Sequence, residues 1–68
     1  MDIENIFKFH APTDVQLVAY DEIQSAAKNL AAVIIAHTPP SADQTAAIRK
    51  VREAVMTANA SVALDGKL

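Results

Sequence analysis

The sequence has no cysteine, no tryptophan and a single glycine, and aromatic residues are few. Without cysteine, neither disulfides nor thiolate zinc sites can stabilise the fold. The longest apolar run, residues 30–36, is far shorter than the roughly 20 residues that a membrane-spanning helix needs. The start of the chain also lacks the basic segment and apolar core of a secretory signal. We therefore expect a cytoplasmic protein without membrane attachment.

The chain also lacks a concentration of positive charge. Its formal net charge is −2 and its Lys and Arg residues are scattered, whereas proteins that bind polymeric nucleic acid usually show a basic face. A small anionic ligand needs only a few local cations and is not excluded. His10 and His37 lie far apart without a cluster of ligating residues around either, so we expect no metal and no other cofactor. No activated nucleophile accompanies a general base, so we expect no enzyme activity.

Two long helices are predicted by their first residues. Thr13–Gln16 and Ser41–Gln44 have the pattern of capping boxes, in which a hydroxyl and a glutamine satisfy the free N–H groups of a helix start. Pro39 and Pro40 disfavour helix in the residues before them, so the first helix should end near His37. So short a linker makes the helices antiparallel neighbours. The expected single domain, 1–68, comprises an arm over 1–12 and helices over 14–37 and 42–64.

Each predicted helix is apolar over more than one face. At about 100° per residue, Ile23 and Leu30 share the side that should pack against Val51 and Val55. Other apolar residues, Met56 among them, fall outside these stripes. A single core is marginal in so short a chain, and symmetric association of copies is a common remedy. We therefore expect an all-α fold, an antiparallel two-helix hairpin with a short N-terminal arm, assembled as a homo-oligomeric helical bundle.

The arm before the first helix is itself rich in large apolar residues. Ile3, Ile6 and Phe7 can line one helical turn, and Phe9 follows shortly after. So many apolar side chains in a dozen residues favour contact with another surface. We expect the arm to dock on a groove, either in its own subunit or in a neighbouring one.

One strip of the hairpin combines cations with apolar residues that fall outside the stripes expected to pack against the other helix. Lys28 lies on this strip with Gln24 in the first helix, and Arg52 lies on it with Met56 and Asn59 in the second. A cation beside apolar surface can bind phosphate, but its stem can equally cover that surface while the charged head stays in water. Asn59 can bind the edge of a base, or it can form a hydrogen bond across an oligomer interface.

Two aromatic residues are candidates for stacking on a base. Phe9 lies in the arm, and Tyr20 lies in the first helix. For both residues, plain packing is the alternative to stacking on a ligand, in the anchor of the arm for Phe9 and in the hairpin core for Tyr20.

The order of several motifs resembles a known family. These motifs are Phe9-His10-Ala11-Pro12, then Gln16, Tyr20, Ile23, Ala27-Lys28-Asn29-Leu30-Ala31, Pro40-Ser41 and Ala54-Val55-Met56-Thr57-Ala58-Asn59-Ala60. The chain is similar, over nearly its whole length, to the helical-hairpin domain of phage cyclic-oligonucleotide sponges, which include anti-CBASS protein two and the hairpin part of Thoeris anti-defence protein one. Family members often have Tyr in place of Phe9, Arg or Lys in place of Gln24, and Trp in place of Thr57.

The resemblance implies trimers that assemble into hexamers in the bacterial host cytoplasm. It implies non-catalytic binding of cyclic dinucleotides, cyclic trinucleotides or cyclic ADP-ribose isomers, which starves the host effector of its signal. The alternative is a structural or adaptor hairpin whose oligomer binds a protein partner, and a hydrolase of the same signals ranks last. The candidate ligand-binding residues are Phe9, His10, Tyr20, Gln24, Lys28, Arg52, Met56 and Asn59.

Overall fold

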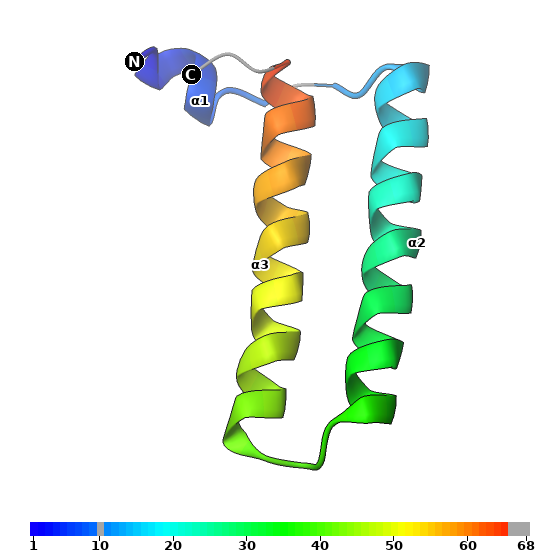
Figure 1. Ribbon diagram of the computed structural model, residues 1–68. Coiled ribbons are helices and arrows are strands. Elements are labelled where there is room, and N and C mark those ends of the chain that lie inside the picture. Colours follow the sequence, from blue (N-terminus) through cyan, green and yellow to red (C-terminus); the bar gives the residue numbers. More distant parts are fainter. Residues whose placement is uncertain (10, 66–68) are drawn as a thin grey trace.

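The computed structural model describes residues 1–9 and 11–65, and these residues form helices without any strand. Helix α1 comprises Ile3–Phe7, α2 comprises Asp14–His37 and α3 comprises Ala42–Leu64. The two long helices run side by side in opposite directions, and α1 lies at the open end of their hairpin (Figure 1). The predicted all-helical hairpin is therefore confirmed. None of the helices in the described ranges combines the length and apolar content that a membrane crossing requires.

The first predicted capping box is present at the start of α2. The Thr13 hydroxyl accepts a hydrogen bond from the Gln16 backbone N–H at 3.2 Å, and the Thr13 N–H donates to Gln16 Oε1 at 2.9 Å. The same glutamine donates from Nε2 to the backbone carbonyl of Val62 at 2.9 Å. One side chain therefore caps α2 and also ties its first turn to the last turns of α3.

The second predicted capping box is only half formed. The Ser41 hydroxyl accepts from the Gln44 N–H at 3.1 Å, as expected. However, Gln44 Nε2 donates to the carbonyl oxygen and to Oγ1 of Thr38, both at 3.1 Å, instead of reaching back to Ser41. The prediction was wrong on this point because the turn brings the end of α2 close to Gln44, and the last carbonyls of a helix lack partners within it.

Helix α3 ends in a left-handed residue. Asp65 has φ 53° and ψ 42°, and its N–H donates to the carbonyls of Ser61 and Val62. Aspartate tolerates this conformation better than most residues. Gly66, the one glycine of the sequence, follows where a helix end commonly has glycine, but it lies outside the described residues, as does His10.

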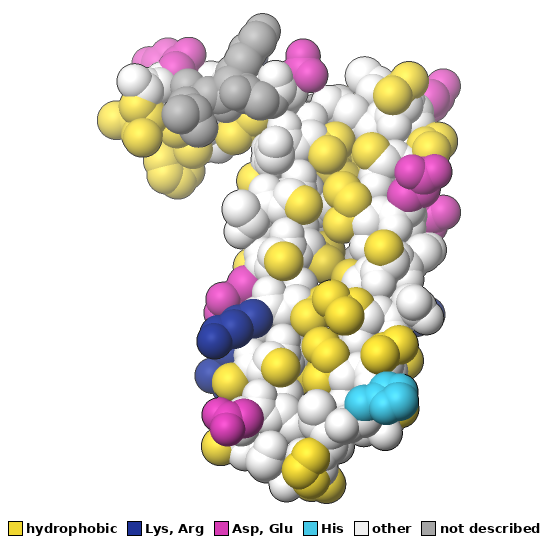
Figure 2. Space-filling model, in the orientation of Figure 1, with side chains coloured by type: hydrophobic (Ala, Val, Ile, Leu, Met, Phe, Trp, Pro, Cys, Tyr) yellow, Lys and Arg dark blue, Asp and Glu magenta, His cyan; other side chains and the backbone are white. Residues whose placement is uncertain are grey.

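The hairpin has no fully buried side chain in the described ranges. Even Leu30, on the side of α2 that faces α3, is 49% exposed. Two helices can cover only a narrow stripe of each other, and this apolar face is wider than that stripe. The pair therefore leaves in water a large apolar surface, which Figure 2 shows along the junction of α2 and α3.

The arm makes no extensive contact with the long helices of its own chain. Ile3 is 65% exposed and Phe7 is 82% exposed, and extensive helix packing is confined to α2 and α3. After Phe7 the backbone becomes extended at Lys8, with φ −79° and ψ 141°, and this places α1 to the side of the long helices (Figure 1). Of the two predicted docking sites, the one in its own subunit is wrong for this structure, and the one in a neighbouring subunit stays a prediction.

The double role of Gln16 predicts a measurable loss of stability. Gln16→Ala removes the bond to Thr13 and the bond to Val62, so the free energy of unfolding should fall by about 1–2 kcal/mol. Urea unfolding followed by circular dichroism, at a fixed chain concentration, measures this difference. Ser25→Ala, an exposed change in the same helix, is the matched control. Equal midpoints for the two variants would contradict the tie between the helices.

Candidate functional site

A groove of about 430 Å³ lies along one side of the junction between α2 and α3. Its walls combine polar and apolar side chains, and we call it the mixed groove. Residues three, four or seven positions apart share one side of a helix, and the lining residues follow this spacing. The lining consists of Gln24, Ala27, Lys28 and Ala31 from α2, and of Ile48, Val51, Arg52, Val55, Met56 and Asn59 from α3.

The mixed groove brings together most of the candidate residues from the sequence. Gln24 and Lys28 come from α2, whereas Arg52, Met56 and Asn59 come from α3, and all five line the same hollow. The sequence placed them on one strip of each helix. The structure adds that the two strips face a common space, so the candidates from separate helices can contact one ligand.

Two cations stand on the walls of the mixed groove. Lys28 and Arg52 are exposed, and within residues 1–9 and 11–65 neither is engaged by a carboxylate. Both charges are thus available to an anion from outside the chain. The floor between them is apolar, with Ala27 and Val51 lining it. Such a floor holds less competing water than an open surface, which strengthens contacts between cations and an anion.

Asn59 carries an unsatisfied acceptor at the side of the mixed groove. Its Oδ1 atom is buried and has no hydrogen-bond partner, the one such side-chain atom among the described residues. An unsatisfied buried acceptor costs about 1–3 kcal/mol, so it usually indicates a missing donor. A ligand, another copy of the chain or an ordered water molecule can supply that donor.

Two further candidates, Tyr20 and Phe9, do not line the mixed groove within one chain. Tyr20 is half-buried one turn before Gln24, but it does not line the groove. Phe9 is 84% exposed in the arm and is also absent from the lining. His10 lies outside the described residues. A stacking ring over the mixed groove must therefore come from another copy or from a change in the position of the arm.

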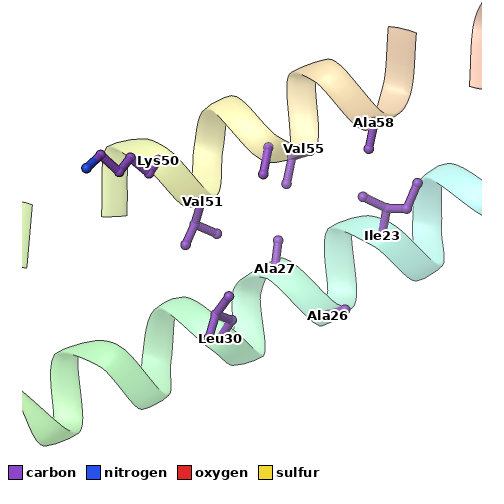
Figure 3. Close-up of a pocket in the computed structure, with 9 residues that line it drawn as sticks. Ile23, Ala26, Ala27, Leu30, Lys50, Val51, Val55 and Ala58 are labelled. Atoms are coloured by element: carbon purple, nitrogen blue, oxygen red, sulfur yellow. The ribbon is translucent and has the colours of Figure 1, made fainter. Parts of the chain in front are cut away.

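The structure also contains a second groove that sequence reasoning missed. It has a volume of about 430 Å³ and shares Ala27, Val51 and Val55 with the mixed groove, so the two lie on either side of one helix contact. We call it the apolar groove, and its remaining lining residues are Ile23, Ala26, Leu30, Lys50, Ala54 and Ala58 (Figure 3). The sequence signal was present in the wide apolar stripes, but dividing them into two surfaces requires the relative rotation of the helices.

No cluster of three potential metal-ligating residues occurs within residues 1–9 and 11–65. A family model described as "Acb2/Tad1, hairpin domain" matches residues 1–63 of the chain. This range contains every lining residue of both grooves and also the arm. Comparison with curated proteins and with solved structures gives no match.

The unsatisfied acceptor of Asn59 leads to a stability prediction. Without ligand, Asn59→Ala removes a buried polar atom that gains nothing and introduces a better helix former, so the free energy of unfolding should rise by about 0.5–1 kcal/mol. Urea unfolding at a fixed chain concentration tests this. A fall of similar size would mean that another copy satisfies the amide, which is the interface role considered for this residue.

Proposed function

This chain belongs to the Acb2/Tad1 hairpin-domain family, and we propose that it captures cyclic oligonucleotide messengers without converting them. The family suggests a phage anti-defence role. The proposed ligands are cyclic dinucleotides, cyclic trinucleotides or cyclic ADP-ribose isomers, held in the cytoplasm of the bacterial host. Capture would lower the free concentration of the signal, so that the host effector stays inactive.

The observation that carries this proposal is the convergence of Lys28 and Arg52 on one groove with an apolar floor. A cyclic dinucleotide has two negative phosphates and two flat bases. One cation from each helix matches the phosphates, and charge-assisted hydrogen bonds of this kind contribute about 1.5–3 kcal/mol each. The apolar side chains, including Ile48 and Met56, suit the face of a base.

The polar amides of the mixed groove support recognition of base edges. Asn59 Oδ1 lacks a donor, and an amino or imino N–H of a base would provide one. Gln24 stands on the opposite helix, with both a donor and an acceptor available. Because Gln24 is uncharged, Lys28, one turn further along α2, is the residue that supplies the phosphate contact on this helix.

Binding of the ligand with micromolar or better affinity requires more contacts than the mixed groove of one chain offers. Micromolar binding corresponds to about 8 kcal/mol, whereas stacking of a base on an aromatic ring adds about 1–3 kcal/mol. We therefore include the homo-oligomer, a trimer or hexamer, in the proposal. A neighbouring copy can place its exposed Phe9 over the mixed groove, and symmetry repeats each cation without a basic chain.

The lining of the mixed groove favours capture over hydrolysis. Among the described residues, no carboxylate, histidine or hydroxyl group lines this groove. A general base must lie within hydrogen-bond reach of the proton that it removes. The walls therefore offer groups that bind and orient an anion, and the proposed role is to hold the signal intact.

A second candidate function is supported by the uncovered apolar surface. Val15 is 80% exposed and Val18 is 60% exposed on α2, and side chains of this kind often mark contacts between proteins. An adaptor hairpin that binds a protein partner would use this surface. It would take up no nucleotide, which separates it from capture.

One experiment distinguishes capture, hydrolysis and the adaptor role. The protein is incubated with a panel of cyclic dinucleotides, cyclic trinucleotides and cyclic ADP-ribose isomers, freed of unbound ligand by gel filtration, and then denatured by heat. We expect the heated sample to release an intact member of the panel, detected by mass spectrometry. A released product of altered mass would indicate an enzyme. No uptake of any member would favour the adaptor.

The two cations of the mixed groove yield a quantitative prediction. Lys28→Ala and Arg52→Ala should each weaken uptake roughly 10- to 100-fold, because each removes one charge-assisted contact of about 1.5–3 kcal/mol. Isothermal titration calorimetry with the captured ligand measures the affinity, and gel filtration checks that the oligomer persists. Arg49→Ala removes the same charge from α3 outside the groove lining and serves as the control. Unchanged affinity in both groove variants would remove these cations from the site.

A further inference from the structure

We propose that the apolar groove is the binding site for the arm of a second copy, with α1 of each chain docking between α2 and α3 of another. This contact goes beyond ligand capture and requires no nucleotide. It assigns a partner to the apolar groove and to the apolar side of α1, which the proposed contact of Phe9 with a ligand leaves unused.

The apolar groove has the chemistry of a protein-binding surface. Its side chains converge from both helices, with Ile23 near Ala58 at one end and Leu30 near Val51 towards the other (Figure 3). Lys50 is the one charged residue of the lining, and its ammonium group extends outward beyond the end near Leu30. A ligand for this groove must therefore be mainly apolar, with a negative group near one end.

The arm matches this description. Ile3, Ile6 and Phe7 lie three and four positions apart and so share one side of α1. Ile3 and Phe7 are 65% and 82% exposed, so most of this side is uncovered in a single chain. Glu4 stands in the first turn of the same helix. The arm thus presents large apolar side chains with a carboxylate beside them.

The charges orient the arm in the groove. Glu4 precedes Phe7 by one turn, so the two lie at opposite ends of α1. When Phe7 occupies the apolar floor, Glu4 of the docked arm can reach Lys50 at the groove end. No carboxylate of the described residues engages Lys50 in a single chain. Docking of the arm therefore places Lys50 of one copy beside the carboxylate of Glu4 from the other copy.

The arm of the same chain is poorly placed for this contact. Leu30, near the Lys50 end, lies roughly 24 Å along α2 from its first residue, at about 1.5 Å per residue. The segment from Phe7 to Thr13 reaches at most about 21 Å when fully extended. The chain's own α1 would approach Lys50 only by stretching this whole segment flat along α2. A second copy has no such restriction.

The mixed groove should bind the arm less tightly than the apolar groove does. Phe7 placed there would cover Gln24 and Asn59, whose amide groups would lose water without gaining hydrogen bonds from an apolar ring. The apolar groove contains no such amide. Exchange of arms through the apolar groove also leaves Lys28 and Arg52 free for an anionic ligand. Reciprocal exchange repeats the contact in each copy, as closed symmetric assemblies do.

The absence of cysteine allows a direct test by disulfide trapping. A tagged chain with Phe7→Cys is mixed, without nucleotide, with an untagged chain carrying Ala54→Cys in the apolar groove, and the mixture is oxidised mildly. We expect a disulfide between tagged and untagged chains, with a yield at least several-fold above that for Ala60→Cys on the outer side of α3. Equal yields for these two positions, or a higher yield for Met56→Cys in the mixed groove, would overturn the proposal.

A double variant separates exchange from docking within one chain. Phe7→Cys with Ala54→Cys in the same chain should yield linked dimers or larger rings whose proportion falls on dilution. A product that stays monomeric on a denaturing gel at every concentration would show that the arm closes on its own groove, which contradicts the exchange. Circular dichroism of each reduced variant verifies that the helices are retained before oxidation.

Charge reversal tests the orientation of the arm. Lys50→Glu in the chain that carries Ala54→Cys should lower the trapping yield several-fold, and Glu4→Lys in the Phe7→Cys chain should restore it. Loss without restoration would contradict the proposed Glu4–Lys50 contact. Because no nucleotide is present, these results are independent of the uptake experiment, and either proposal can fail while the other holds.

Discussion

Ala27, Val51 and Val55 line both grooves, so the contact of α2 with α3 at these side chains sets the shape of every surface proposed to bind. The small Ala27 side chain allows the helices to approach, and the two valines fill the space that remains. This contact therefore sets the positions of the other residues that line the two grooves. A change in the size of any of these three side chains would alter both grooves, because the side chains line both.

Hydrogen bonds at the two ends of the hairpin keep that contact in register. At the open end, Gln16 donates to the Val62 carbonyl at 2.9 Å, and at the closed end Gln44 donates to Thr38 at 3.1 Å. Both bonds join a glutamine near a helix start to a carbonyl of the other helix or its cap. Sliding of one helix along the other would break both bonds, so Lys28 and Arg52 stay on facing walls.

The lack of a buried core explains how so small a chain can carry two different surfaces. The described residues include no fully buried side chain, and the apolar groups of each helix extend well beyond their mutual contact. On one side, cations and amides border the remaining apolar strip, which suits an anion with flat bases. On the other side the strip is almost purely apolar, which suits another protein segment. The exposed arm supplies a segment of that kind.

The sequence by itself determined the local structure: Thr13 and Ser41 begin the long helices because their hydroxyls satisfy free N–H groups, and the prolines after His37 end the first one. It also placed Lys28 and Arg52 on the strips that face the mixed groove, because position on a helix follows from spacing alone. Only the tertiary structure decided that those strips meet, that the apolar stripes divide into two grooves, and that Gln44 binds Thr38. These features depend on the rotation of each helix and on the path of the turn, which local spacing does not specify.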